Sequence, residues 1–243
     1  MPDQSISDAA ARDYASLFNP PFELDRRGAA LVVVDMQYAS ASRRHGLGAL
    51  LKAKGLEDRG AYRFDRIEQV VTPTIQRLLV AFRRGKLPVI FLTVGSELPD
   101  FADMLPGMRR FAEAIGNTEG TREHRILDEL APLAGEAVVN KTTMSAFHSS
   151  GFERLVKAMG RTQLCFTGVS TNSCVEGTAR DAADRGFQCV IVEDGCGAAS
   201  ATARCSSCAP RPTAGSRCPT RPPAAASTSN PSAATTRPSS RAG

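Results

Sequence analysis

The run AALVVV at residues 29–34, followed at once by Asp35, is the stretch that decides the fold. Six consecutive apolar residues predict a strand that is buried on both faces, as the strands of parallel sheets are. Further apolar runs predict more strands, and apolar residues spaced three or four apart predict helices between them. The strands are expected at 29–34, 88–94, 137–139, 163–169 and 188–193, and the helices at about 65–84, 152–159 and 173–185. This alternation predicts an α/β fold: a three-layer α/β/α domain with a mainly parallel, Rossmann-like sheet.

The net positive charge of the chain comes from its C-terminal end. The net charge is +5, but residues 201–243 hold six arginines and no lysine or acidic residue, which leaves 24 basic and 25 acidic side chains in residues 1–200. A nearly neutral body removes the main argument for a polyanionic partner. We therefore predict no nucleic-acid partner.

The same C-terminal segment has no apolar pattern. Residues 201–243 contain no Leu, Ile, Val, Phe, Met or Tyr, and they hold seven of the 15 prolines. Such a segment buries too little apolar surface to offset its ordering entropy, so we predict a disordered tail behind a domain of residues 1–200, of which 1–26 form an N-terminal extension. An Ala/Pro/Arg/Ser-rich composition is also what GC-rich coding DNA yields out of frame, and a frameshift is our hypothesis for its origin.

Nothing in the sequence indicates secretion or a membrane. No stretch approaches the roughly 18 consecutive apolar residues of a membrane span, and the N-terminus lacks an apolar core flanked by basic residues. The seven cysteines show no paired spacing in the first 200 residues, which fits a reducing compartment. We expect a cytoplasmic protein without a membrane partner.

Polar residues that follow the predicted strands are the candidates for a functional site, because ligands of parallel sheets bind beyond the carboxyl ends of the strands. Asp35 closes the first strand and Lys141 follows the third. Each also has an ordinary structural interpretation, Asp35 as a loop-end or capping carboxylate and Lys141 as a solvated side chain.

Cys174 carries more information than either of them. It lies in GVSTNSCVEGTARDA (168–182), a turn of small residues after the fourth strand, where Thr171 or Asn172 could cap the following helix. A helix N-terminus lowers the pKa of a thiol and supplies free N–H groups for an oxyanion, so we interpret Cys174 as a nucleophile rather than a buried small apolar residue. Cys165 and Cys189, inside apolar strands, fit the buried alternative.

Taken together, these segments resemble the isochorismatase-like cysteine hydrolases. The resemblance rests on the strand-end D-x-Q at 35–37, on Lys141 and on the Cys174 turn, and it extends over residues 29–199. It implies a catalytic triad of Asp35, Lys141 and Cys174, a cis peptide before Ser170, and an oxyanion hole formed by the backbone N–H groups of Ser170 and Cys174. Asp35 would move the proton of the thiol to the leaving amine, and Lys141 would favour both anions.

Departures from the family pattern narrow the substrate. Nicotinamidase members hold a metal with two histidines after the second strand, whereas TVGSELPDFADM (93–104) contains none. We therefore predict no catalytic metal and no cofactor. The nucleophilic cysteine favours an amide over isochorismate, and the turn looks nearest to the ureidoacrylate and N-carbamoyl amide hydrolases.

Four residues near the strand ends are candidates for substrate binding: Gln37, Tyr38, Phe147 and Asn172. Each also has an equally plain structural alternative. Gln37 could be a loop hydrogen bonder, Tyr38 and Phe147 could belong to the edge of the core, and Asn172 could be a helix cap.

The sequence thus predicts a cysteine-dependent amidohydrolase that cleaves a small amide or ureido/carbamoyl compound through a thioester and releases ammonia. The resemblance also implies a homo-oligomer. Three alternatives remain: a silent or unstable member that lacks the family's usual C-terminal elements, a nicotinamidase-type amidase, and a protein that binds acidic partners through its tail.

Overall fold

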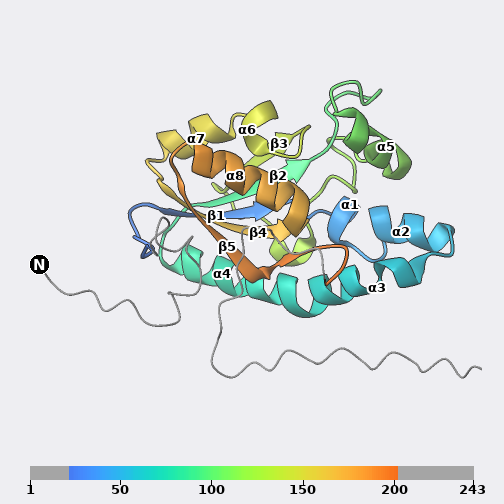
Figure 1. Ribbon diagram of the computed structural model, residues 1–243, viewed down its shortest axis with the longest axis horizontal. Helices are drawn as coiled ribbons and strands as arrows, with labels where there is room; N and C mark the ends of the chain where they lie inside the picture. The colour runs from blue at the N-terminus through green and yellow to red at the C-terminus, as the bar shows by residue number, and fades with distance from the viewer. Residues whose placement is uncertain (1–21, 202–243) are drawn as a thin grey trace, which may run out of the picture. The chain divides into compact units, whose positions relative to one another are not determined.

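A five-stranded sheet lies at the centre of the fold. The computed structural model describes residues 22–201. The strands are β1 (Ala29–Val34), β2 (Val89–Val94), β3 (Ala137–Lys141), β4 (Gln163–Val169) and β5 (Gln188–Gly197). Their order is β3-β2-β1-β4-β5, and every neighbouring pair is parallel (Figure 1). The predicted α/β fold with a parallel sheet is confirmed, whereas the tail predicted at 201–243 lies, beyond its first residue, outside the described part.

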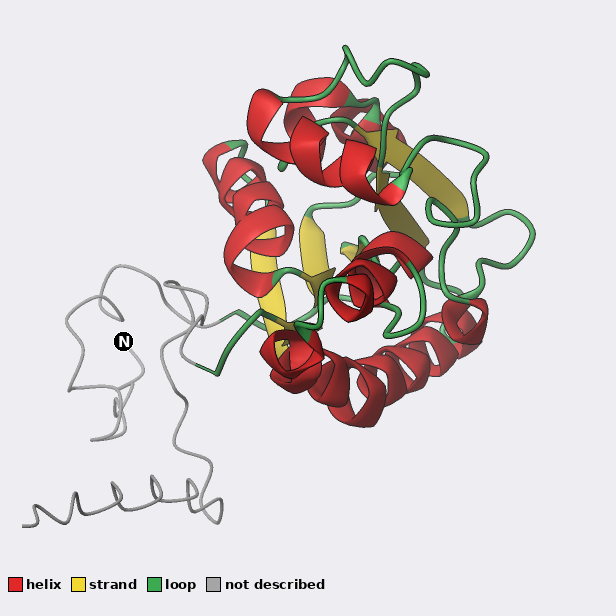
Figure 2. Ribbon diagram, turned by 90° about the vertical axis from the view of Figure 1, so that its right-hand side faces the viewer, coloured by secondary structure: helices red, strands yellow, loops and turns green. Residues whose placement is uncertain are grey.

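Helices cover both faces of this sheet (Figure 2). They are α1 (Tyr38–Ala41), α2 (Gly46–Ala53), α3 (Glu57–Arg66), the π-helical segment η3 (Ile67–Val71), α4 (Thr72–Arg84), α5 (Pro106–Ile115), the 3-10 turn η4 (Asp128–Leu130), α6 (Ala146–Ser149), α7 (Phe152–Ala158), the π-helical turn η5 (Thr171–Val175) and α8 (Glu176–Asp184). Leu31 and Val33 of β1 pack toward the face covered by α3, η3 and α4. Val32 and Val34 pack toward the face covered by α6, α7 and α8. The unbroken apolar run of β1 therefore supplies both cores of a three-layer sandwich.

Three elements extend beyond their predicted limits. The helix expected from residue 65 begins at Glu57 with α3, whose sequence EDRGAYRFDR is mostly polar and charged. Strand β3 continues to Lys141, because Asn140 and Lys141 remain paired with Thr93 and Val94 of β2. Strand β5 continues past residue 193 to Gly197, through an irregularity in its pairing with β4.

The sheet order fixes where a site can form. The chain runs from β1 outward to β3 and then returns to the other side of β1 with β4, so the strand order reverses between β1 and β4. At that point the two backbones are in close contact. Gly168, paired with Val34 in register, has φ +111°, and a side chain there would overlap the Val34 carbonyl. Asp35 directly follows the end of β1, and Ser170 directly follows the end of β4.

Among the helices of residues 22–201, none has both the length and the apolar character needed to cross a membrane.

Candidate active site

Asp35 turns the chain at the end of β1. It has φ 50°, in the left-handed region that aspartate tolerates better than most residues, and it is only 2% exposed. Its backbone N–H donates to the Leu92 carbonyl of β2 at 2.9 Å, and its carbonyl accepts from the Ser40 hydroxyl at 2.5 Å. These backbone hydrogen bonds hold Asp35 in place, with its carboxylate buried at the end of β1.

Lys141 extends from β3 to meet this carboxylate. Its Nζ lies 2.9 Å from Asp35 Oδ2 and donates to the Thr143 carbonyl at 3.2 Å, and its side chain is completely buried. Burial alone would lower the pKa of Lys141, but the charges of Asp35 and Cys174 and the hydrogen bonds to them together outweigh burial, and the pKa is raised. The other carboxylate oxygen, Asp35 Oδ1, is buried without a hydrogen-bond partner among the described residues. The pair therefore retains one free acceptor.

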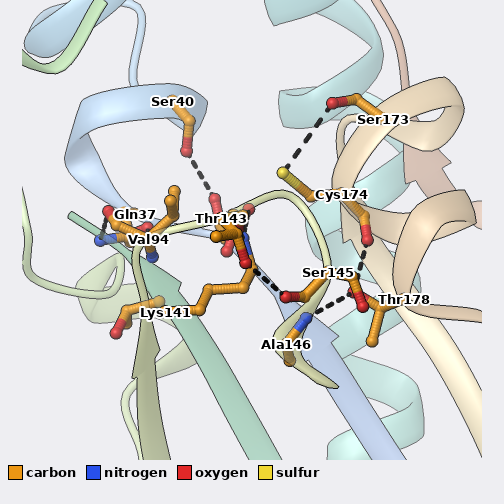
Figure 3. Close-up of polar contacts among 12 residues, drawn as sticks. Gln37, Ser40, Val94, Lys141, Thr143, Ser145, Ala146, Ser173, Cys174 and Thr178 are labelled. Atoms are coloured by element: carbon orange, nitrogen blue, oxygen red, sulfur yellow. Dashed lines mark hydrogen bonds and ion pairs between the residues drawn. The ribbon is translucent and has the colours of Figure 1, made fainter. Parts of the chain in front are cut away.

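Cys174 approaches the same place from the opposite side. It lies in η5 between β4 and α8 and is 7% exposed, and Figure 3 shows its sulfur pointing away from α8 toward the side where Ser40 and Lys141 lie. The peptide bond between Val169 and Ser170 is cis, as the resemblance implies. The residue that begins the turn is Ser170 rather than Thr171 or Asn172, the two caps suggested by the sequence.

The pKa of the Cys174 thiol differs from the sequence-based prediction. Burial, reinforced by the charge of Asp35, raises it to about 12, and the opposing effect of Lys141 is smaller. The prediction of a lowered thiol pKa is therefore wrong, because it considered the helix N-terminus and not the loss of solvent around the sulfur. Cys174 is a protonated thiol at neutral pH, with a free carboxylate oxygen nearby to receive its proton.

This raised pKa has a measurable consequence. Between pH 6 and pH 10, the difference in thiolate absorbance near 240 nm between the wild type and Cys174→Ala is expected to stay flat, since a thiol with a pKa near 12 does not ionise in that range. Both proteins share all other cysteines, which cancel in the difference. A titration step below pH 8 would show instead that the site stabilises the thiolate at rest.

Arg63 is a site residue that the sequence did not reveal. It projects from α3, is 6% exposed, and donates from Nη1 to the Ser170 hydroxyl at 2.8 Å. Burial lowers its pKa to about 10, against the opposing charges of Cys174 and Asp35. The sequence did not single out Arg63, because an arginine in a helix as polar as α3 is expected to lie on the solvent-exposed face. The sole hint is its position beside Phe64, which is buried in the core.

Two predicted substrate residues follow β1 closely, Gln37 as the residue before α1 and Tyr38 as the first residue of that helix. Gln37 is completely buried, and its side chain accepts from the Val94 N–H at 2.9 Å and donates to the His124 carbonyl at 2.7 Å. Its hydrogen bonds therefore connect the ends of β1 and β2 to the segment before β3. This is the structural role that the sequence indicates as the alternative for Gln37. The Tyr38 ring packs edge-on against His45, with the Arg122 guanidinium 5.2 Å from its centre.

The other two lie on the α6–α8 side. The Phe147 ring is partly buried and packs against the apolar cluster of that face. It contacts the rings of Phe152 and Phe187 and lies under Arg185. Asn172 is exposed within η5, near the nucleophile turn. Substrate binding by Gln37, Tyr38, Phe147 and Asn172 stays a prediction.

The histidines do not gather in one place. His124 Nε2 lies 2.9 Å from the Asn140 amide oxygen, His148 pairs with Asp181 at 3.0 Å, and His45 packs on Tyr38. Within residues 22–201, no three His, Cys, Asp or Glu side chains are grouped so that they could hold a metal ion.

Comparison with known proteins decides the family. Residues 29–209 match the model of the isochorismatase domain. The chain belongs to the isochorismatase family. Among its relatives, the ureidoacrylate amidohydrolase RutB of Variovorax paradoxus (strain S110) is 32% identical over 188 residues, which cover 72% of this chain and 70% of that protein. RutB of Pseudomonas syringae pv. syringae (strain B728a) is 31% identical over 188 residues, covering 72% of each.

Solved structures of the isochorismatase family share the fold. A cysteine hydrolase from Pseudomonas syringae pv. phaseolicola 1448A superposes with a TM-score of 0.60 at 24% identity, over 73% of this chain and 76% of that one. The N-carbamoylsarcosine amidase from Thermoplasma acidophilum gives 0.53 at 25% identity, over 70% and 84%. The predicted family and the predicted class of enzyme, a hydrolase, are confirmed.

Proposed function

We propose that this chain is a cysteine-dependent amidohydrolase that cleaves a small amide or a ureido/carbamoyl compound and releases ammonia. The observation that carries the proposal is the meeting of three side chains at the point where the strand order reverses. The Cys174 thiol is influenced by both Asp35 and Lys141, and Asp35 keeps one buried oxygen without a partner. The names of the relatives, a ureidoacrylate amidohydrolase and an N-carbamoylsarcosine amidase, support a substrate of this class.

In the first half of the proposed reaction, Asp35 acts as a general base. Because the thiol is protonated at rest, its proton moves to Asp35 Oδ1 as the sulfur attacks the amide carbonyl carbon. The carbonyl oxygen becomes an oxyanion, which the backbone N–H groups of Ser170 and Cys174 would stabilise at the start of the helical turn. Asp35 then gives the proton to the nitrogen, and ammonia leaves a thioester on Cys174.

The second half reverses these roles. Water attacks the thioester carbonyl, Asp35 accepts a proton from that water, and the proton returns to the sulfur as the carboxylic or carbamic acid leaves. Lys141 stays charged throughout and holds Asp35 Oδ2, so that Oδ1 does the proton transfer. A buried ammonium also lowers the energy of each anionic state.

The substrate class is tested by ammonia release from a panel of amides. Nicotinamide, ureidoacrylate, N-carbamoyl amino acids, biuret and maleamate would be compared with and without a chelator. We expect the ureido or carbamoyl compounds to be cleaved with a kcat/KM at least about tenfold above nicotinamide, and unchanged by the chelator. A preference for nicotinamide that the chelator abolishes would favour the nicotinamidase-type alternative.

Three further expectations accompany this proposal. The resemblance implies a homo-oligomer, and the cysteine usage implies a cytoplasmic location. The predicted partner is the small amide substrate, with no role for nucleic acid.

A further inference from the structure

Arg63 is a buried cation that takes no part in the proton transfers proposed above. Its guanidinium donates twice to the Ser40 carbonyl, from Nε at 3.1 Å and from Nη2 at 2.9 Å, and once to the Ser170 hydroxyl at 2.8 Å. The Ser40 hydroxyl in turn donates to the Asp35 carbonyl. One side chain therefore connects the turn that carries the proposed base with the turn that carries the proposed nucleophile.

The charge of Arg63 is not matched by a carboxylate. Lys141 pairs with Asp35, but none of the ion pairs formed within residues 22–201 includes Arg63. With the Cys174 thiol protonated, the buried groups around it carry one net positive charge. A buried cation without a counterion is strongly unfavourable, unless negative charge develops next to it.

The reaction would move negative charge away from the Asp35–Lys141 pair. When Asp35 accepts the thiol proton, its negative charge is replaced by one on Cys174 Sγ and then by one on the oxyanion beside Ser170, the residue that Arg63 holds, so the net charge of the buried groups is unchanged. The charges of Cys174 and Asp35 are also the two that oppose the effect of burial on Arg63.

We propose that Arg63 is the positioning and charge-balancing residue of this site. Its planar guanidinium orients the turn that begins at Ser170 by donating to the Ser170 hydroxyl. Its positive charge stabilises the anions that form on Cys174 and on the substrate oxygen. This inference rests on the proposed function, but part of its test does not require a substrate.

The first test is the rate at which iodoacetamide alkylates Cys174 at pH 8, followed by mass spectrometry of the Cys174 peptide. Arg63→Gln removes the charge, so the thiolate fraction and the rate should fall about tenfold, which corresponds to one pKa unit. Arg66→Gln is the matched control, because Arg66 projects from the same helix and binds the Cys196 and Glu193 carbonyls. Its rate should stay within about twofold of the wild type. Equal rates in all three proteins, or an equal loss in both variants, would overturn the charge-balancing role.

A second variant covers the case in which Arg63→Gln does not fold. Arg63→Lys keeps a positive charge and loses the planar fork, so the alkylation rate should stay within about threefold of the wild type while kcat falls about tenfold. The fall should be the same for neutral biuret and for anionic ureidoacrylate, with KM unchanged. A wild-type kcat would overturn the positioning role, and a loss confined to the KM of ureidoacrylate would show that Arg63 binds a substrate carboxylate instead. Failure of the proposed function would be distinguishable from failure of the Arg63 proposal. In that case the wild type would release no more ammonia than Cys174→Ala.

Discussion

Cys174→Ala is expected to release ammonia at least about a thousandfold more slowly than the wild type on its best amide substrate. The expectation follows from covalent catalysis, in which removal of the nucleophile leaves only the binding and oxyanion contributions. The fold should survive, because the thiol is small and the hydrogen bond that it accepts from the Ser173 hydroxyl, at 3.9 Å, is long. Cys174→Ser should be similarly inactive, since a buried hydroxyl is a weaker nucleophile and a poorer leaving group.

The chain offers a matched control for this variant. Cys165 is another buried thiol, 2% exposed, and burial raises its pKa to about 11. It lies inside β4 in the apolar cluster that faces α4, away from the Cys174 turn. Cys165→Ala should lower stability by about 1–2 kcal/mol through the lost volume, with kcat unchanged. A Cys174→Ala protein as active as Cys165→Ala would refute the assignment of the nucleophile.

The buried ion pair between Asp35 and Lys141 should give the second largest effect. Lys141→Met leaves the Asp35 carboxylate buried without its partner, and Asp35→Asn leaves the Lys141 ammonium in the same condition. Each change is expected to lower the free energy of unfolding by about 3–5 kcal/mol, and each should abolish turnover. The double variant should regain much of that stability, because no buried charge is left uncompensated, and it should stay inactive.

Denaturant unfolding of the wild type, the two single variants and the double variant provides the test. Arg43 pairs at the surface with both Asp65 and Glu68, and these exposed contacts set the scale for ordinary ion pairs. Arg43→Met should cost about 1 kcal/mol or less. Single Asp35 and Lys141 variants within that range, or a double variant whose loss equals the two single losses together, would show that the pair is not coupled as its burial implies.

The sequence predicted the fold well wherever local pattern decides it. The runs at β1, β2 and β4 are mostly apolar and every residue in them is buried, and their predicted positions agree with the structure within a residue. Predictions failed where tertiary contacts override local pattern. Strand β3 ends with two polar residues, yet it continues to Lys141 because β2 pairs with it.

The candidate site likewise has features that local sequence pattern predicts and features that depend on tertiary contacts. Asp35, Lys141 and Cys174 could be found as candidates because strand ends meet at one edge of a parallel sheet. The thiol pKa could not be predicted, since burial of the sulfur depends on elements distant in sequence. Arg63 was missed for the same reason. Only the packing of α3 on the sheet shows that one arginine of a polar helix lies inside the protein.

Mass spectrometry of the enzyme during turnover tests the covalent mechanism most directly. The wild type would be mixed with its best amide substrate, quenched in acid within the first turnovers and digested. The account predicts that the peptide carrying Cys174 gains the mass of the acyl or carbamoyl group, and that this adduct is absent from Cys174→Ala. Release of ammonia while Cys174 stays unmodified, or an adduct on another residue, would contradict it.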